Sequence, residues 1–147
     1  VWQADENGTY DVQLASGNAA GESILRGRGK LVTDAAGCFS FRSILPESYP
    51  IPHDGPVGKL LSAVGRHPWR PAHLHFMIHA DKHEPLITHI FRDGDPYLDS
   101  DAVFGVRSSL IADWTEHKPG TAPDGTQLDT PFYTLAFDFI LNPEAAT

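Results

Sequence analysis

The chain has 147 residues with 11 basic and 19 acidic side chains, and its formal net charge at pH 7 is −8. This acidic balance, without a cluster of Lys or Arg, argues against a protein that binds nucleic-acid phosphates. The single cysteine, Cys38, excludes an internal disulfide framework and fits a reducing compartment, so we expect a cytoplasmic protein. No apolar run approaches the roughly 18–20 residues that a membrane-spanning helix needs.

The first third of the chain has the pattern of short strands joined by turns. Residues 34–37 (D-A-A-G) separate two β-prone segments, which predicts a hairpin with Phe39 and Phe41 on one face. Tyr10 follows an early turn and, taken alone, is typical of a half-buried strand tyrosine. The elements predicted here are a strand over residues 1–4, a turn over 5–8, a loop over 15–21 and hairpin strands over 28–33 and 38–43.

Residues 49–52 (Y-P-I-P) cannot be helical, because the residue before each proline is pushed to extended geometry. Such a rigid loop suits a side chain, Tyr49, that must be held in one direction. The spacing of the apolar residues that follow predicts one short helix, which Gly65 can end. Its expected apolar face consists of Val57, Leu60, Leu61 and Val64.

The segment 72–80 (A-H-L-H-F-M-I-H-A) is the most informative in the sequence. Apolar residues alternate with histidines, which predicts a strand with His73, His75 and His79 on one face. Residues two apart on a strand are about 6.6 Å apart along it, so His73 and His75 can bind one ion, whereas His79 lies about 13 Å beyond and cannot join them. Many metal proteins share this spacing, and a plain polar face also fits it.

Arg70 precedes the histidine pair, and a buried arginine beside a metal is costly unless an anion binds there. This raises the odds of a functional site over those of a polar face. The remaining histidines are in predicted loops and are expected to be exposed rather than to bind metal: His53, His67, His83 and His117.

Beyond the histidine strand the chain again alternates strands and turns. Ser100 and Asp101 are expected to cap a brief helical turn. The other predicted elements are a strand over 86–92 that pairs with the histidine strand, a turn over 93–96, a loop over 118–130 and a closing strand over 132–141. Together the segments predict an all-β fold, a β-sandwich of mostly antiparallel strands with one or two short helices.

Tyr10, Tyr49, the run R-P-A-H-L-H and the segment G-D-P-Y-L-D-S-D-A-V-F resemble the catalytic domain of the intradiol ring-cleaving dioxygenases. The resemblance covers nearly the whole chain, so residues 1–147 are expected to form one catalytic β-sandwich domain. The segments Y-P-I-P-H-D-G-P-V-G and Y-L-D-S-D-A-V-F-G-V look most like those of hydroxyquinol-cleaving members of the family, rather than catechol-cleaving ones.

The resemblance implies a non-haem Fe(III), one per chain, bound by Tyr10, Tyr49, His73 and His75, with a hydroxide completing the coordination. Fe(III) favours anionic oxygen, which suits two phenolates. In the family the second tyrosine, here Tyr49, leaves the metal when substrate binds and takes a substrate proton.

The resemblance also implies roles for residues around the iron. Arg70 corresponds to the arginine that stabilises negative charge developing on the substrate ring. His89 stands where we expect a glutamine in catechol-cleaving relatives, and it is predicted to hydrogen-bond near the reacting oxygen. Taken alone, it is a polar cross-strand neighbour of the histidine strand. Four residues are implied to line the ring pocket beside Arg70: Pro50, Ile51, Pro52 and Val103.

The implied partners are a small aromatic diol or triol and O2. Hydroxyquinol (benzene-1,2,4-triol) would be opened between its two adjacent hydroxylated carbons to give maleylacetate. Relatives carry an N-terminal helical region that forms a homodimer interface and one wall of the substrate pocket, and nothing in this sequence corresponds to it. The chain also begins without Met, apparently within a strand, so we expect further residues upstream.

Three alternatives remain open. The substrate can instead be catechol or a chlorocatechol, which would give a muconate. A His/His/carboxylate site for Fe(II) or Zn(II) could use Asp81, Glu84 or Asp95, although it leaves both tyrosines unexplained. A metal-free β-sandwich binding module would tolerate loss of the paired histidines.

Overall fold

The structure is a computed structural model that describes residues 1–14 and 26–145. Its elements are α1 (Asp11–Leu14), β1 (Tyr49–Pro50), α2 (Pro56–Ala63), β2 (Trp69–Arg70), β3 (His73–Ile78), β4 (Leu86–Arg92), η2 (Ser108–Leu110), β5 (Ile111–Ala112), β6 (Thr115–His117), β7 (Gly120–Thr121), β8 (Gln127–Leu128) and β9 (Phe132–Thr134). None of the helices in residues 1–14 and 26–145 has the length and hydropathy of a membrane-spanning segment.

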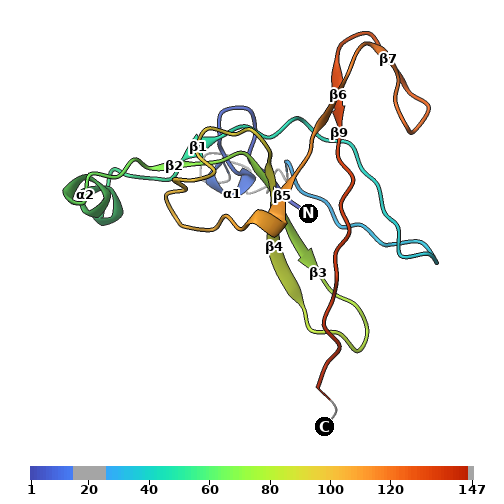
Figure 1. Cartoon of the computed structure of the whole chain (residues 1–147), viewed down its shortest axis with the longest axis horizontal. Coiled ribbons are helices and arrows are strands. Elements are labelled where there is room, and N and C mark those ends of the chain that lie inside the picture. Colours follow the sequence, from blue (N-terminus) through green and yellow to red (C-terminus); the bar gives the residue numbers. More distant parts are fainter. Residues whose placement is uncertain (15–25, 146–147) are drawn as a thin grey trace, which may run out of the picture.

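The centre of the molecule is the antiparallel hairpin of β3 and β4, with β5 parallel to β4 (Figure 1). The alternation predicted for the histidine strand is confirmed, since Leu74 and Phe76 are buried on the face opposite the histidines. Ile90 on β4 and Ala112 on β5 complete this core cluster. Leu135, Phe137 and Phe139 from the C-terminal segment pack against it.

The C-terminal part of the chain differs in detail from the prediction. The predicted closing strand is regular only over β9, which pairs antiparallel with β6. Beyond Thr134 the chain still places apolar side chains on the core, but among the described residues its backbone pairing there is reduced to an isolated bridge between Pro143 and His83. The predicted loop over residues 118–130 contains a short hairpin of β7 and β8, which extends away from the core with β6 and β9 (Figure 1).

The predicted first hairpin is confirmed at its turn but not along its strands. The Asp34 amide donates to the Cys38 carbonyl at 2.9 Å, and Gly37 has φ +79°, a conformation that favours glycine. The flanking segments form no regular strand in the described chain. Instead, Phe39 and Phe41 lie with ring centroids 6.3 Å and 6.4 Å from that of Phe76, so they cover the core by aromatic contact alone.

The N-terminal segment forms bridges rather than the predicted strand. Trp2 exchanges backbone hydrogen bonds with His75, at 3.1 Å and 2.9 Å, and also bridges to Arg28. This segment therefore lies beside β3 and brings the residues that follow it toward the histidine face. The loop predicted over residues 15–21 lies outside the described residues.

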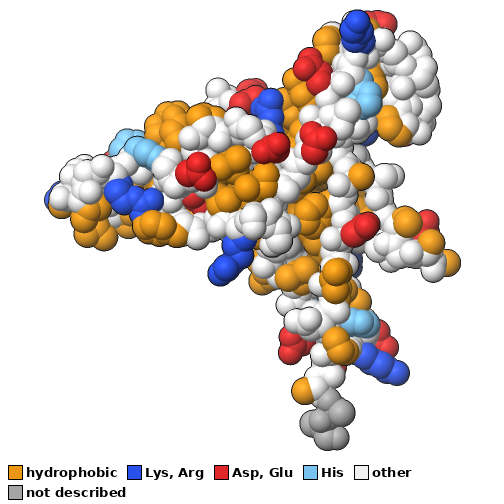
Figure 2. All heavy atoms as spheres, in the orientation of Figure 1, with side chains coloured by type: hydrophobic (Ala, Val, Ile, Leu, Met, Phe, Trp, Pro, Cys, Tyr) orange, Lys and Arg blue, Asp and Glu red, His pale blue; other side chains and the backbone are white. Residues whose placement is uncertain are grey.

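Helix α2 confirms the predicted short helix, and Gly65 follows it with φ +67°. Its expected apolar face is only partly buried. Leu61 is 9% exposed, but Leu60 and Val64 are 64% and 59% exposed. The helix projects from one end of the molecule, and hydrophobic side chains are visible on the surface at that end (Figures 1 and 2).

Candidate metal centre

The predicted metal ligands converge although they come from three separate parts of the chain. Tyr10 directly precedes α1, Tyr49 opens β1, and His73 and His75 lie on β3. The Tyr10 hydroxyl is 2.9 Å from the Tyr49 hydroxyl and 2.8 Å from His75 Nε2. His73 Nε2 is 3.1 Å from His75 Nε2 and 3.4 Å from the Tyr49 hydroxyl. Two phenol oxygens and two imidazole nitrogens thus meet at one point.

The ring of His73 is held in the orientation that metal binding requires. Its Nδ1 lies 2.6 Å from the carbonyl oxygen of Pro71, which can only accept, so Nδ1 carries the proton. Nε2 then presents its lone pair to the cluster, as in metal-bound histidines whose other nitrogen donates to a carbonyl. His75 is fixed differently, because the Trp2 ring stacks on it at 4.7 Å between centroids and 5° between planes.

The protonation states of the cluster suit neutral nitrogen ligands. Burial, followed by the charge of Arg70, lowers the pKa of His73 to about 3. Burial, followed by the neighbouring His73, lowers the pKa of His75 to about 3. Burial and the hydrogen bond with Tyr49 raise the pKa of Tyr10. Both imidazoles are therefore neutral at physiological pH, and Tyr10 stays a phenol until a cation compensates its negative charge.

Arg70 is buried next to the cluster, with 6% of its surface exposed. It is the antiparallel partner of Tyr49 in the β1–β2 pair, and its Nη1 lies 3.2 Å from His73 Nε2. Its Nε and Nη2 donate to the two carboxylate oxygens of Asp101 at 3.1 Å and 3.3 Å. A full positive charge is thus held beside the predicted metal position.

Asp101 is a functional candidate that the sequence analysis missed. The helical turn predicted to begin at Ser100 and Asp101 is absent from the described chain, where the next helical segment is η2. Burial would raise the pKa of Asp101, but hydrogen bonds from Arg70 and from the Gly105 amide outweigh it and hold that pKa below its ordinary value. The buried arginine signals that a carboxylate partner is needed, but several acids lie in this segment and the sequence does not say which one pairs.

His89 lies opposite His75 in the β3–β4 pair, with ring centroids 4.4 Å apart. One nitrogen from each of His73, His75 and His89 lies within 4.8 Å of the others, the one such cluster of His, Cys, Asp and Glu among the described residues. Burial, followed by the charge of Arg70, lowers the pKa of His89. The structure therefore places His89 beside the predicted metal ligands. From there it is close enough either to hydrogen-bond near the reacting oxygen, as predicted, or to contact the metal itself.

The carboxylates considered for a His/His/carboxylate site do not join this cluster. Asp81 and Glu84 are exposed in the β3–β4 connection. Asp95 uses its carboxylate oxygens to accept the Ala72 and Tyr97 amides, both at 2.9 Å. Within the described residues the alternative site therefore has no carboxylate among its possible ligands, since the third member of the cluster is His89.

The other four histidines predicted to lie in loops are outside the cluster, but three are less exposed than predicted, and His117 ends strand β6 instead of lying in a loop. His53 is exposed, whereas His67, His83 and His117 are half-buried. The reason for two of them is a hydrogen bond, since His67 Nε2 lies 2.9 Å from the Ser100 hydroxyl and His117 Nε2 lies 2.8 Å from the Thr134 hydroxyl.

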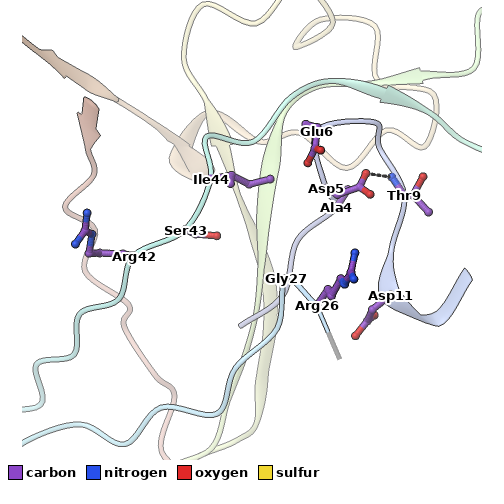
Figure 3. Close-up of a pocket in the computed structure, with 10 residues that line it drawn as sticks. All are labelled: Ala4, Asp5, Glu6, Thr9, Asp11, Arg26, Gly27, Arg42, Ser43 and Ile44. Carbon is purple, nitrogen blue, oxygen red and sulfur yellow. Dashed lines mark hydrogen bonds between the residues drawn. The ribbon is translucent and has the colours of Figure 1, made fainter. Parts of the chain in front are cut away.

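The residues predicted to line the substrate pocket do not converge as the predicted metal ligands do. Pro50 and Ile51 are half-buried beside Tyr49, whereas Pro52 is exposed. Val103 is 46% exposed, and its amide lies 3.3 Å from the Asp101 carboxylate. None of these four residues lines the cavity of about 490 Å³ shown in Figure 3. That cavity contains no aromatic side chain, and its charged lining residues are Asp5, Glu6, Asp11, Arg26 and Arg42.

Comparisons with known proteins agree with this picture. A family model described as Dioxygenase (Dioxygenase_C) matches residues 1–143. The 6-chlorohydroxyquinol 1,2-dioxygenase of Cupriavidus pinatubonensis is 56% identical over 97% of this chain and 46% of its own length. The hydroxyquinol 1,2-dioxygenase of Rhodococcus opacus is 50% identical over 98% of this chain and 47% of its own. The chain thus spans about half the length of these relatives.

A solved structure gives the same result for the fold. The hydroxyquinol 1,2-dioxygenase of Pseudomonas putida aligns with a TM-score of 0.80 and 43% identity, over 97% of this chain and 49% of that one. This likeness confirms the predicted all-β sandwich. The family model and these relatives cover nearly every residue, so the chain belongs to the intradiol ring-cleaving dioxygenase family.

Proposed function

We propose that the protein is a non-haem Fe(III) intradiol dioxygenase that cleaves hydroxyquinol with O2 between its adjacent hydroxylated carbons, giving maleylacetate (3-hydroxy-cis,cis-muconate). The convergence of the Tyr10 and Tyr49 hydroxyls with His73 Nε2 and His75 Nε2 carries this proposal. The names of the similar proteins from Cupriavidus and Rhodococcus support hydroxyquinol, or a ring-chlorinated hydroxyquinol, as the substrate class.

The residues present fit one Fe(III) per chain. Two phenolates supply anionic oxygen, which a hard trivalent cation favours, and two neutral imidazoles complete a protein donor set. The raised pKa of Tyr10 fits the same reading, because a cation at this position would offset the burial of a phenolate. When bound, the iron would make the coordinated aromatic diol electron-rich enough to react with O2.

The residues of this chain would bind, orient and deprotonate the substrate. The Tyr49 phenolate is the proposed acceptor of a substrate hydroxyl proton. Because Pro50 keeps the local backbone stiff, Tyr49 would leave the metal by side-chain rotation and not by a rearrangement of the loop. Arg70 Nη1 points at the centre, where it would stabilise negative charge developing on the ring. His89 would hydrogen-bond near the reacting oxygen, and Pro50, Ile51, Pro52 and Val103 would contact the ring faces.

The first test is a visible spectrum of the iron-loaded protein, followed by anaerobic addition of hydroxyquinol. Tyrosinate ligation predicts a phenolate-to-Fe(III) charge-transfer band that shifts to longer wavelength when the substrate binds. Tyr10→Phe and Tyr49→Phe are each expected to weaken that band. The chain has four tyrosines, and Tyr97→Phe and Tyr133→Phe are the matched controls, which should leave the band intact. A protein that holds iron but has no such band would overturn the proposal in favour of a His/carboxylate site.

The second test concerns the substrate. Rates on hydroxyquinol, catechol and a chlorocatechol, measured by O2 uptake and product absorbance, should be highest for hydroxyquinol. Faster cleavage of catechol or a chlorocatechol to a muconate would move the protein to the alternative substrate class. A homodimer of the kind the family resemblance implies and a cytoplasmic location stay predictions, to be checked by light scattering and by cell fractionation.

A further inference from the structure

We propose that Asp101 is a positioning residue, whose carboxylate directs the Arg70 guanidinium at the metal centre and ties that direction to the place of Val103. This inference rests on the proposed function, in which Arg70 and Val103 act on the substrate. In this inference Asp101 contacts neither the metal position nor the substrate ring. It acts by setting the direction of Arg70 and the position of Val103.

The hydrogen bonds of Arg70 leave one end of its guanidinium for the site. Nε and Nη2 each donate to a different oxygen of Asp101, at 3.1 Å and 3.3 Å, which is the two-point geometry that suits the planar fork of arginine. Because the group is planar, fixing two nitrogens fixes the direction of the third. That third nitrogen, Nη1, lies 3.2 Å from His73 Nε2.

Both partners are shielded from water, so the pair is not an ordinary surface contact. Arg70 is 6% exposed and Asp101 is 3% exposed. Removing one partner of a buried pair leaves the other charge uncompensated, which forces the remaining group to move or to recruit water. The direction of Arg70 is therefore expected to depend strongly on the Asp101 carboxylate.

Asp101 is in turn held on several sides. Its carboxylate accepts the amides of Val103 at 3.3 Å and Gly105 at 2.8 Å. Its backbone carbonyl accepts Arg66 Nη2 at 2.8 Å. The carboxylate is thus the common acceptor for Arg70 and for the turn that carries Val103, and a displacement of one would be transmitted to the other.

The fit between this turn and Arg70 is close. A Cβ at Gly105 would lie 3.1 Å from Arg70 Nη2 and 3.2 Å from the Asp101 carboxylate, so only glycine leaves the pair undisturbed. The preceding residue, Phe104, has φ +58°, a conformation that non-glycine residues rarely adopt. The Arg66 guanidinium lies 3.7 Å above the Phe104 ring centroid and helps to hold it there.

The exposed pair of Arg42 and Asp124 provides a contrast within the same chain. Its closest atoms are 3.5 Å apart, and its side chains are 54% and 45% exposed. Such a pair adds little to stability and directs no group. Asp124→Asn therefore serves as the matched control for Asp101→Asn.

The test is a double-mutant cycle of Asp101→Asn and Arg70→Lys in the iron-loaded, full-length enzyme. Lysine keeps the positive charge but cannot make the two-point contact. Asp101→Asn alone should lower kcat by roughly 100-fold, the size expected when a catalytic group is displaced by about 1 Å. Combined with Arg70→Lys, it should lower kcat by less than about threefold more, because residues that act through one another are not additive. Asp124→Asn should leave kcat unchanged.

A second readout is the anaerobic dissociation constant of hydroxyquinol, followed by the charge-transfer band and independent of turnover. Asp101→Asn weakens the hydrogen bond to the Val103 amide, so hydroxyquinol should bind more weakly to this variant. In the Arg70→Lys background the further loss of affinity from Asp101→Asn should be smaller, as for kcat. If Asp101 had only a structural role, its substitution would lower kcat and affinity by the same factor in both backgrounds, and that result would overturn the inference.

Two further outcomes are distinguishable. If Asp101→Asn does not fold or does not bind iron, Asp101→Glu replaces it, since it keeps the charge but displaces the carboxylate by one methylene. Positioning predicts a loss of kcat in Asp101→Glu, and unchanged kcat would refute it. If the unaltered enzyme binds iron but cleaves no aromatic diol, the proposed function fails and the inference about Asp101 fails with it.

Discussion

The β3–β4 hairpin and helix α2 both carry a regular apolar pattern, yet only the hairpin buries it. Phe76 and Ile90 are 5% and 0% exposed, whereas Leu60 and Val64 on α2 are 64% and 59% exposed. The hairpin is covered by Phe39, Phe41 and the C-terminal phenylalanines, which come from distant parts of the chain. The period of a pattern thus predicts the type of element, whereas burial depends on whether another layer lies against it.

The two faces of β3 sharpen this comparison further. One face is anchored in the core, and the other carries His73 and His75 at the metal centre. The centre therefore lies on a strand that is anchored in the core, while α2 lies at the periphery (Figure 1). Substitutions on β3 are expected to have large effects, and matched substitutions on α2 small ones.

The largest expected effect is loss of the metal from the histidine face. His73→Ala should lower iron affinity by roughly 100-fold or more, since removing even a supporting contact of a metal ligand costs 10–100-fold. His79→Ala is the matched control, because His79 follows the same strand on the same predicted face but is exposed and outside the cluster. Iron bound per chain after dialysis measures both, and equal iron content in the two variants would contradict the assignment.

The next effect concerns the opposite face of the same strand. Phe76→Ala should lower the free energy of unfolding by about 3–5 kcal/mol, because it leaves a cavity in a closed core. Leu60→Ala on α2 should change it by no more than about 0.5 kcal/mol, as is usual at exposed positions. Denaturant unfolding gives both values. A loss for Leu60→Ala that approaches the loss for Phe76→Ala would mean that the exposed face of α2 is covered in solution.

A smaller effect is expected at Gly58, where α2 is closely packed against the preceding loop. Gly58 is buried, and a Cβ there would overlap the backbone carbonyl of His53. Gly58→Ala should therefore destabilise the protein by roughly 1–3 kcal/mol through overpacking, although Gly→Ala within a helix ordinarily stabilises. Ser62→Ala, at an exposed position of α2, is the control and should be near neutral. A Gly58→Ala variant that is more stable than the unaltered chain would contradict this expectation, because it would show that the backbone at His53 shifts at little cost.

The smallest effect is a pH dependence of the free energy of unfolding. It arises from the ion pair of Arg28 and Asp11, close to the N-terminal segment that bridges to β3. Arg28, which bridges to Trp2, donates a hydrogen bond that holds the pKa of Asp11 below its ordinary value. A lowered folded-state pKa adds stability that is fully present above the unfolded pKa of about 3.9 and is lost as pH falls through the folded value. The unaltered chain should therefore be more stable than Asp11→Asn at neutral pH, with the difference shrinking below about pH 4.

Chemical unfolding across this pH range measures the difference. The control is Asp138→Asn, a substitution of an exposed carboxylate in the C-terminal segment. A difference between the unaltered chain and Asp11→Asn that stays constant into acid would contradict the role of the ion pair.

The sequence predicted best where one local pattern decides the outcome. The alternation around His73 and His75 determines which side of β3 faces the core, and the prolines next to Tyr49 determine its extended backbone. That Tyr10 and Tyr49 meet these histidines came from resemblance to a family, because no local rule relates residues so far apart. The ligand roles of all four stay predictions until metal binding is measured.

What the sequence missed depends on contacts between distant segments. Asp101 pairs with Arg70 across 31 positions, and several carboxylates between them could have been chosen. The exposure of Leu60 follows from the absence of a covering layer in the described chain, which a helical period cannot reveal. The stacking of Trp2 on His75 likewise depends on how an irregular N-terminal segment meets β3.

That stacking also makes Trp2 a natural fluorescent reporter of metal binding. With the Trp2 ring 4.7 Å from His75, indole emission would be quenched by a ferric phenolate chromophore at the neighbouring atoms. Fluorescence titration could therefore follow iron entry and release in the unlabelled protein. Trp2→Phe would leave only the emission of Trp69 and Trp114. Subtracting the spectrum of this variant from that of the unaltered protein would then give the emission of Trp2.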